Sequence, residues 1–275
     1  MAAELPSPPE SSLDDVTVFM PVGGRGTRAQ EVTGNAPKHL IKLGNGQAVL
    51  DIACRGLQRA GFRNFVFCVG YHKDKIKDHI ASETWIDTEG VDYNFSEEDE
   101  EALIGPERAV LRAIGTLGLE GNGLIVPGDM LLPWKGIAAM SRRHAERGTD
   151  ITIGVTSHPA AYSAHFGRLV VDHSDRLLWC RDKPATAADT LPGSRNFTSA
   201  TALAMDTSRF VEICNRLEAQ APIPTGSVDL RDRLLAAAIG SPEFTIEAYD
   251  TKGLVIDIGT KDTIQHAKEN WAQYV

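Results

Sequence analysis

VFMPVGGRGTR occupies residues 18–28, and the pair Pro37-Lys38 follows it closely. A short apolar run therefore ends in three glycines, with two arginines and a threonine among them. Glycines allow backbone conformations and close approaches that a Cβ would block, so successive N–H groups can converge on an anion while nearby cations neutralise its charge. The pattern predicts a phosphate-binding loop at the end of a strand, with the lysine as an additional cation.

Strands and helices alternate around this loop. Val16–Val22 has the length and branching of a buried strand, and Gln47–Ala60 carries apolar residues at helical spacing before Gly61. Phe65–Val69 is a second buried strand. A strand, a helix and a strand in this order predict a parallel sheet. Because ligands of open α/β sheets usually bind at the carboxyl ends of the strands, the glycine-rich loop lies where a site is expected.

The later part of the chain is less regular. Glu97–Glu101 is an acidic run that we interpret as a solvated loop, the alternative being a loop that shapes a neighbouring nucleotide site. The other expected elements are helices over His72–Ile80, from Gly105, and over Trp134–Arg147, Ser208–Leu217 and Val228–Ala238, strands over Gly123–Pro127, Ile151–Thr156, Phe166–Asp172, Arg176–Cys180, Asn196–Met205 and Gly253–Ile258, and a last helix from Lys261. No repeat or linker divides the sequence, so we expect one domain over residues 15–275 behind a disordered, proline-rich and polar tail over residues 1–14.

Composition limits the classes of partner. The chain has 275 residues, of which 42% are hydrophobic and 24% charged, and 28 Lys and Arg against 37 Asp and Glu give a net charge of −9. This balance argues against broad attraction to nucleic acid or anionic membranes, so anionic substrates must be captured locally. Four scattered cysteines without C-x-x-C spacing, no membrane-length apolar run and no secretion pattern predict a protein of the reducing cytoplasm. A homo-oligomer stays an open alternative.

Two aspartates stand at the ends of apolar strands. Asp129 follows Gly128 directly after Gly123–Pro127, where a carboxylate can hold a metal ion over the edge of the sheet; a simple Gly-Asp turn is the alternative. Asp257 ends the last strand, and its alternative role is to cap the helix that begins near Thr260.

Together these motifs resemble the signature of the sugar-1-phosphate nucleotidyltransferases over about residues 16–270. GGRGTR with Pro37-Lys38 resembles the family's G-G-x-G-T-R and P-K elements, Gly128-Asp129 its first metal aspartate, Gly167 and Asp182-Lys183-Pro184 its sugar-site elements, and Asp257 its second metal aspartate. The resemblance implies a glycosyltransferase-A-like, Rossmann-like α/β fold: a three-layer sandwich with a mixed, mostly parallel central sheet. It also implies a reaction in which an NTP and a sugar 1-phosphate give an NDP-sugar and pyrophosphate.

The resemblance also implies roles for the motif residues. Arg28, Lys38 and Lys183 are the expected catalytic cations, with Lys38 bridging the reacting phosphates and Lys183 gripping the sugar phosphate. Asp129 and Asp257 would hold one Mg²⁺, a hard cation that prefers oxygen ligands. The expected nucleotide-binding residues are Val22, Gly23, Gly24, Gly26, Thr27, Gly105 and Gly128, and the expected sugar-phosphate residues are Gly167, Asp182, Lys183 and Asn196.

The chain departs from the family pattern in the segments that choose substrates. Asp182 replaces a glutamate, residues 198–203 read TSATAL without the usual glycine and tyrosine, and residues 105–109 read GPERA instead of a glycine-rich G-T-A run. These departures leave the nucleobase open. They also keep a cyclitol phosphate as an alternative acceptor.

Three rival interpretations compete with nucleotidyl transfer. Residues 24–29 also fit the dinucleotide fingerprint, with Asp51 as the ribose acid, but the polar segment toward Gly34 and Pro37 is a poor helix start for an NAD oxidoreductase. A glycosyltransferase of the same fold should carry an Asp-x-Asp motif, whereas residues 128–130 supply one aspartate. The third rival is a catalytically silent subunit that binds NDP-sugar, which could afford to lose the metal aspartates or the phosphate lysine that this chain keeps.

Overall fold

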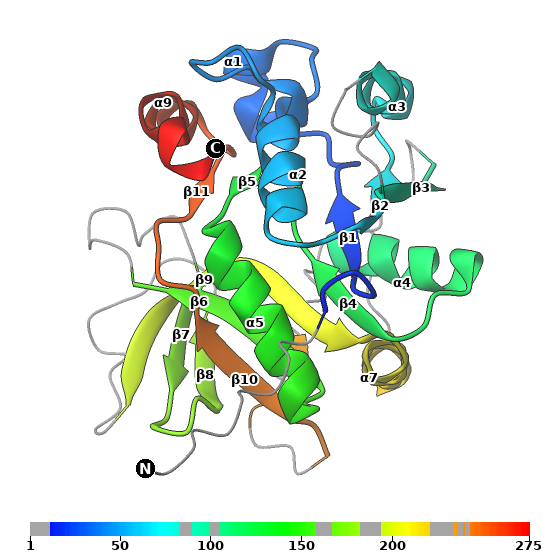
Figure 1. Ribbon diagram of the computed structural model, residues 1–275, viewed down its shortest axis with the longest axis vertical. Helices are drawn as coiled ribbons and strands as arrows, with labels where there is room; N and C mark the ends of the chain where they lie inside the picture. The colour runs from blue at the N-terminus through cyan, green and yellow to red at the C-terminus, as the bar shows by residue number, and fades with distance from the viewer. Residues whose placement is uncertain are drawn as a thin grey trace, which may run out of the picture.

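The computed structural model describes residues 12–82, 90–99, 105–157, 167–181, 194–220, 234–235, 239 and 243–275. Within them nine strands form a mixed sheet. Figure 1 shows helices packed against this sheet. The strands are β1 (Thr17–Pro21), β2 (Asn64–Val69), β3 (Asp92–Glu97), β4 (Asn122–Ile125), β5 (Met130–Leu131), β6 (Ile151–Thr156), β7 (Arg168–Val171), β8 (Leu177–Arg181), β9 (Arg195–Asp206), β10 (Ile246–Asp250) and β11 (Ile256–Asp257). The helices are α1 (Gln30–Thr33), α2 (Val49–Arg59), α3 (Lys73–Ser82), α4 (Pro106–Leu117), α5 (Trp134–Arg147), α7 (Thr207–Gln220) and α9 (Lys261–Asn270), with short 3₁₀ turns η1 (Thr27–Ala29), η2 (Lys38–Leu40) and η3 (Trp271–Tyr274).

The main sheet has the order β10-β6-β9-β4-β1-β2-β3, and β7 with β8 extends it from β9. β1 pairs in parallel with β2 and β4, and β2 with β3, as the alternation of strands and helices predicted. β9 runs antiparallel to both of its neighbours in the centre, β4 and β6. The carboxyl ends of β1, β2 and β4 therefore share one edge.

Helices cover both faces of this sheet because the strand side chains alternate. Val18 and Met20 of β1 belong to one buried cluster, which also contains residues of α2, α3 and α5. Phe19 points to the opposite face and packs in a second cluster with residues of α4 and α7. In Figure 1, α2 and α5 lie in front of the sheet. The predicted three-layer fold with a mixed, mostly parallel sheet is confirmed.

β9 changes partner along its length. Its first residues pair with β7, and Leu203–Asp206 pair with β4, while β6 follows it on the other side. Between the two parts, Thr201 has φ 58° and coincides with a register shift opposite Ile153–Val155. A β-branched residue rarely adopts a left-handed backbone, so Thr201 marks a strained kink where the strand turns from one partner to the other.

Most predicted elements are present, but three strands were missed and two interpretations need correction. β3, β5 and β10 are short or partly polar, and the neighbours that define them are distant in sequence. Glu98 in the acidic run is 6% exposed, so this run is not wholly solvated. The disordered tail expected over residues 1–14 does not extend to Leu13, which is buried in the first cluster; residues 1–11 lie outside the described ranges. The expected helix over residues 228–238 falls largely outside them.

None of the helices in the described part of the chain combines the length and the apolar character that crossing a membrane would need.

We predict that His144 makes the fold sensitive to mild acid. Its ring lies 3% exposed in α5, with Nδ1 3.0 Å from Thr152 Oγ1. Burial lowers the pKa of His144, although the nearby carboxylates of Asp206 and Asp150 act in the opposite direction. When the pH decreases below the ordinary pKa of about 6.5, the unfolded chain binds a proton at this histidine that the folded chain does not bind. The free energy of unfolding therefore decreases as the pH is lowered.

Urea unfolding at pH 7.5 and 5.5 checks this prediction. The loss of unfolding free energy on acidification should be smaller in His144→Gln, which keeps a polar side chain but does not titrate. An identical loss in the wild type and this variant would show that His144 makes no such contribution.

Candidate active site

A two-stranded sheet brings the predicted metal aspartates together. β5 and β11 pair antiparallel, with Met130 opposite Asp257. The Ile258 N–H donates to the Asp129 carbonyl oxygen at 3.2 Å. Asp129 and Asp257 thus lie next to each other although 127 residues separate them in the chain. This ladder is the reason that two distant strand ends can supply one pair of carboxylates.

The glycine-rich loop leaves β1 through tight contacts that need glycine. A Cβ on Gly23 would lie 2.7 Å from the Gly70 backbone nitrogen, and the Tyr71 N–H donates to the Gly23 carbonyl at 3.0 Å. Gly26 has φ 61° and precedes η1, which presents Thr27 and Arg28 to solvent. The loop is therefore fixed against the end of β2, with exposed polar groups at its tip.

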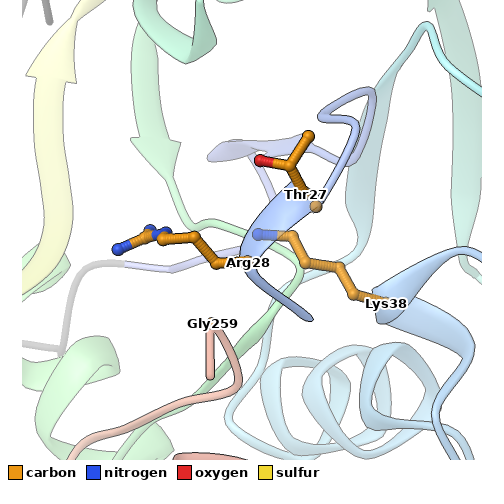
Figure 2. Close-up of a pocket in the computed structure, with 5 residues that line it drawn as sticks. Thr27, Arg28, Lys38 and Gly259 are labelled. Carbon is orange, nitrogen blue, oxygen red and sulfur yellow. The ribbon is translucent and has the colours of Figure 1, made fainter. Parts of the chain in front are cut away.

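Lys38 enters the same space from η2. Its stem packs on Gly26, where a Cβ would lie 3.2 Å from Lys38 Cδ, and its ammonium forms an ion pair with Asp129. Figure 2 shows Arg28 and Lys38 above Gly259 in a cleft of about 150 Å³, which Gly26 and Thr27 also line. Two cations and two carboxylates meet at this point of the fold.

Charge coupling keeps both partners of the ion pair ionised. Burial alone would lower the pKa of Lys38, but the charge and hydrogen bond of Asp129, with the more distant Asp257, raise it. Burial would raise the pKa of Asp129, and the attraction of Lys38 lowers it instead. The neighbouring His39 is neutral, since burial and the Lys38 charge lower its pKa to about 4.

Two further glycines set the position of the aspartates. A Cβ on Gly128 would lie 2.4 Å from Val22 Cγ1, so the turn that carries Asp129 packs directly on the end of β1. A Cβ on Gly259 would lie 2.8 Å from Asp257 Oδ1. Gly259 was not predicted to line the site. Its signal in the sequence was its place two residues after an expected metal ligand.

The structure leaves some predicted residues apart from the cleft. Gly105 is the residue before α4, with φ 90°, and the Gly167 carbonyl accepts from Ser199 in the β7–β9 region. Asn196 on β9 has a buried Oδ1 without a hydrogen-bond partner among the described residues. Asp182 and Lys183 lie outside the described ranges. Their predicted roles stay predictions.

Asp257 is not the cap of the last helix, which was its alternative role. The Thr263 N–H donates to Thr260 Oγ1 at 3.3 Å, and the Thr260 N–H donates to Thr263 Oγ1 at 3.1 Å. Thr260 is therefore the N-cap residue of α9, and it forms a capping box with Thr263.

The sequence matches a known family over most of its length. The sequence pattern of the family described as "Nucleotidyl transferase" matches residues 19–221, which contain the end of β1, the glycine-rich loop, Lys38 and Asp129. The chain belongs to this family. Among curated relatives, the glucose-1-phosphate adenylyltransferases of Cereibacter sphaeroides and Roseobacter denitrificans are 24% and 27% identical over 65% and 60% of this chain. The chain spans only 44% and 42% of their lengths.

Solved structures show the family fold over nearly the whole chain. The inositol-1-phosphate CTP transferase from T. maritima has a TM-score of 0.71 and 15% identity, with 94% of this chain and 95% of that one covered. A UTP-bound UGPase from Acinetobacter baumannii has a TM-score of 0.70 and 19% identity, with 93% of each chain covered. The predicted resemblance to sugar-1-phosphate nucleotidyltransferases is confirmed at the level of family and fold.

We predict that Gly128→Ala destabilises the fold by forcing the Asp129 turn away from Val22. Overpacking of this kind typically costs about 1–3 kcal/mol. Gly24→Ala is the matched control, because a Cβ there would meet nothing within 4 Å. In urea unfolding the control should stay within about 0.5 kcal/mol of the wild type. Equal unfolding free energies for the two variants would contradict the packing described here.

Proposed function

We propose that the protein transfers a nucleotidyl group from an NTP to a sugar 1-phosphate, releasing pyrophosphate and an NDP-sugar. The observation that carries the proposal is the convergence of Arg28 and Lys38 with Asp129 and Asp257 at the end of the glycine-rich loop. Family membership and the adenylyltransferase relatives support it. We further propose a cytoplasmic location, supported by free thiols at all four cysteines.

The site residues suit a reaction that needs its phosphate charges neutralised and does not need a general base. A sugar phosphate is already anionic near neutral pH, so its oxygen can attack the α-phosphorus without deprotonation. The barrier comes from aligning two anions and from charge on the leaving pyrophosphate. Arg28 and the loop amides would bind the triphosphate, and Lys38 would hold the two reacting phosphates together. Lysine suits this role as a compact charge on a flexible stem.

Asp129 and Asp257 fit a divalent cation, for which we propose Mg²⁺. Both offer hard carboxylate oxygens, and the β5–β11 ladder keeps them adjacent. The described residues contain no group of three or more His, Cys, Asp or Glu side chains arranged around one metal position, so substrate phosphates and water would complete the shell. When bound, the ion would neutralise charge on the phosphates.

The acceptor phosphate and the nucleobase of the NTP are best tested together. A matrix of the common NTPs against sugar and cyclitol 1-phosphates, read out as pyrophosphate release, should show release for at least one pair. Asp129→Asn and Lys38→Met should lower that release by about 10²–10³-fold, the usual cost of losing a preorganised charge partner. Release in no pair would favour the silent binding subunit. Full activity of either variant would reject the site.

We predict that Lys38 competes with the metal ion for Asp129. The Lys38–Asp129 ion pair, whose side chains are 17% and 15% exposed, must open before a cation reaches that carboxylate. Lys38→Met should therefore bind Mn²⁺ without nucleotide about fivefold more tightly, the equivalent of about 1 kcal/mol for a partly exposed ion pair. Mn²⁺ titration followed by electron paramagnetic resonance measures this directly.

Lys42→Met is the control, since Lys42 is exposed and lies near in sequence. It should bind Mn²⁺ as the wild type does, and Asp129→Asn should lose most binding. If Lys38→Met bound Mn²⁺ no better than the wild type, the competition would be refuted.

A further inference from the structure

A small hydrophobic cluster lies beside all four charged groups of the site. We call it the site core, and it consists of Ala29, Leu43, Val49, Ile52, Leu131, Ile256, Ile258, Ile264, Ala267 and Tyr274, with Ile41, Leu254 and Trp271 packed against it. Ala29 is next to Arg28, and Ile256 and Ile258 flank Asp257. Asp129 directly precedes β5, which contains Leu131, and Ile41 directly follows η2, which carries Lys38. The backbone of each charged residue is thus anchored in one shared packing unit.

The C-terminal segment closes this core. Ile264 and Ala267 of α9 and Tyr274 of η3 are each at most 5% exposed within it. In Figure 1, α9 lies beside α2 at the end of the molecule where the glycine-rich loop and β11 also lie. Because α9 begins at Lys261, shortly after Asp257, the packing of this segment also holds the chain that leaves β11.

Trp271 presses on the turn behind Lys38. A Cβ on Gly44 would lie 2.5 Å from Trp271 Nε1 and 3.4 Å from two ring carbons, so the indole lies directly on this glycine. Gly44 belongs to a turn that is closed by a hydrogen bond, in which the Leu43 N–H donates to the Gln47 carbonyl at 2.9 Å. The Val49 N–H then donates to the Ile41 carbonyl at 3.0 Å. A shift of this turn is therefore passed to η2 and to the Lys38 stem.

Tyr274 fixes the strand that carries Asp257. Its hydroxyl donates to the Leu254 carbonyl at 2.7 Å, and its own carbonyl accepts from Trp134 Nε1 at 3.1 Å. Leu254 stands shortly before β11, and Trp134 begins α5 shortly after β5. Tyr274 thereby links the chain segments that lead to Asp257 and away from Asp129.

We propose that Trp271 and Tyr274 are positioning residues for catalysis: the C-terminal segment sets the place of Lys38 through Gly44 and that of Asp257 through Leu254. Neither residue lines the cleft described above. The proposal rests on the proposed function. Misplacement of a catalytic group by about 1 Å can cost about 10²-fold in rate, so small shifts of this segment matter for turnover.

Gly44→Ala tests the contact from the opposite side, because the added methyl group must displace the indole or the turn. With the NTP and acceptor that the wild type uses, kcat should fall about 10- to 100-fold. The KM of the NTP should change far less, since the glycine-rich loop is unaltered. Trp271→Phe lacks the Nε1 atom that the methyl group meets, so the double variant Gly44→Ala/Trp271→Phe should recover most of the lost kcat.

Gly115→Ala is the matched control, since a Cβ on this residue of α4 meets nothing within 4 Å. It should keep the wild-type kcat. A wild-type kcat in Gly44→Ala, or a double variant no faster than Gly44→Ala, would overturn the proposal. If Gly44→Ala does not fold, Tyr274→Phe decides, with a several-fold lower kcat expected and an unchanged kcat contradicting it. Absence of turnover in the wild type itself would instead reject the proposed function.

Discussion

The site depends on a ladder of two residue pairs. Met130–Leu131 and Ile256–Asp257 are far apart in the chain, yet their pairing decides that two carboxylates share one place. Like charges at such proximity repel, and the structure balances them with the Lys38 ammonium, whose stem lies on Gly26. The glycine-rich loop, the Gly-Asp turn and the last strand are therefore one electrostatic unit. Each of these elements can place its charged group in the site only when the other two are also in place.

Much of the fold could be read from local sequence. α5 and β6 match their predicted bounds because amphipathic spacing and β-branched runs are local signals, and β1 and β2 have long apolar cores. β5 and β10 escaped prediction because a strand of two residues, or one that alternates polar residues, exists only through its distant neighbour. The kink at Thr201 had no local signal either, since threonine does not favour a left-handed backbone.

Some features of the candidate site could likewise be predicted from local sequence, and others needed the structure. Motifs alone named Arg28 and Lys38, which line one cleft, and Asp129, which pairs with Lys38, because these motifs fix residue type and spacing together. That Asp257 is no helix cap needed the structure, in which Thr260 performs this task. The role of Trp271 could not be inferred from sequence at all. Its significance comes from a glycine more than two hundred residues earlier, against which its ring is pressed.

The kink in β9 has a consequence for how such a protein can diversify. The part of β9 after Thr201 pairs with β4, which leads to Asp129. The part before Thr201 pairs with β7 of the β7–β8 hairpin. A strained joint between them uncouples the register of the two parts. If the protein has the proposed function, insertions or exchanges in the hairpin can accumulate over evolutionary time without shifting the Lys38–Asp129 site, so the two halves of the sheet can change independently.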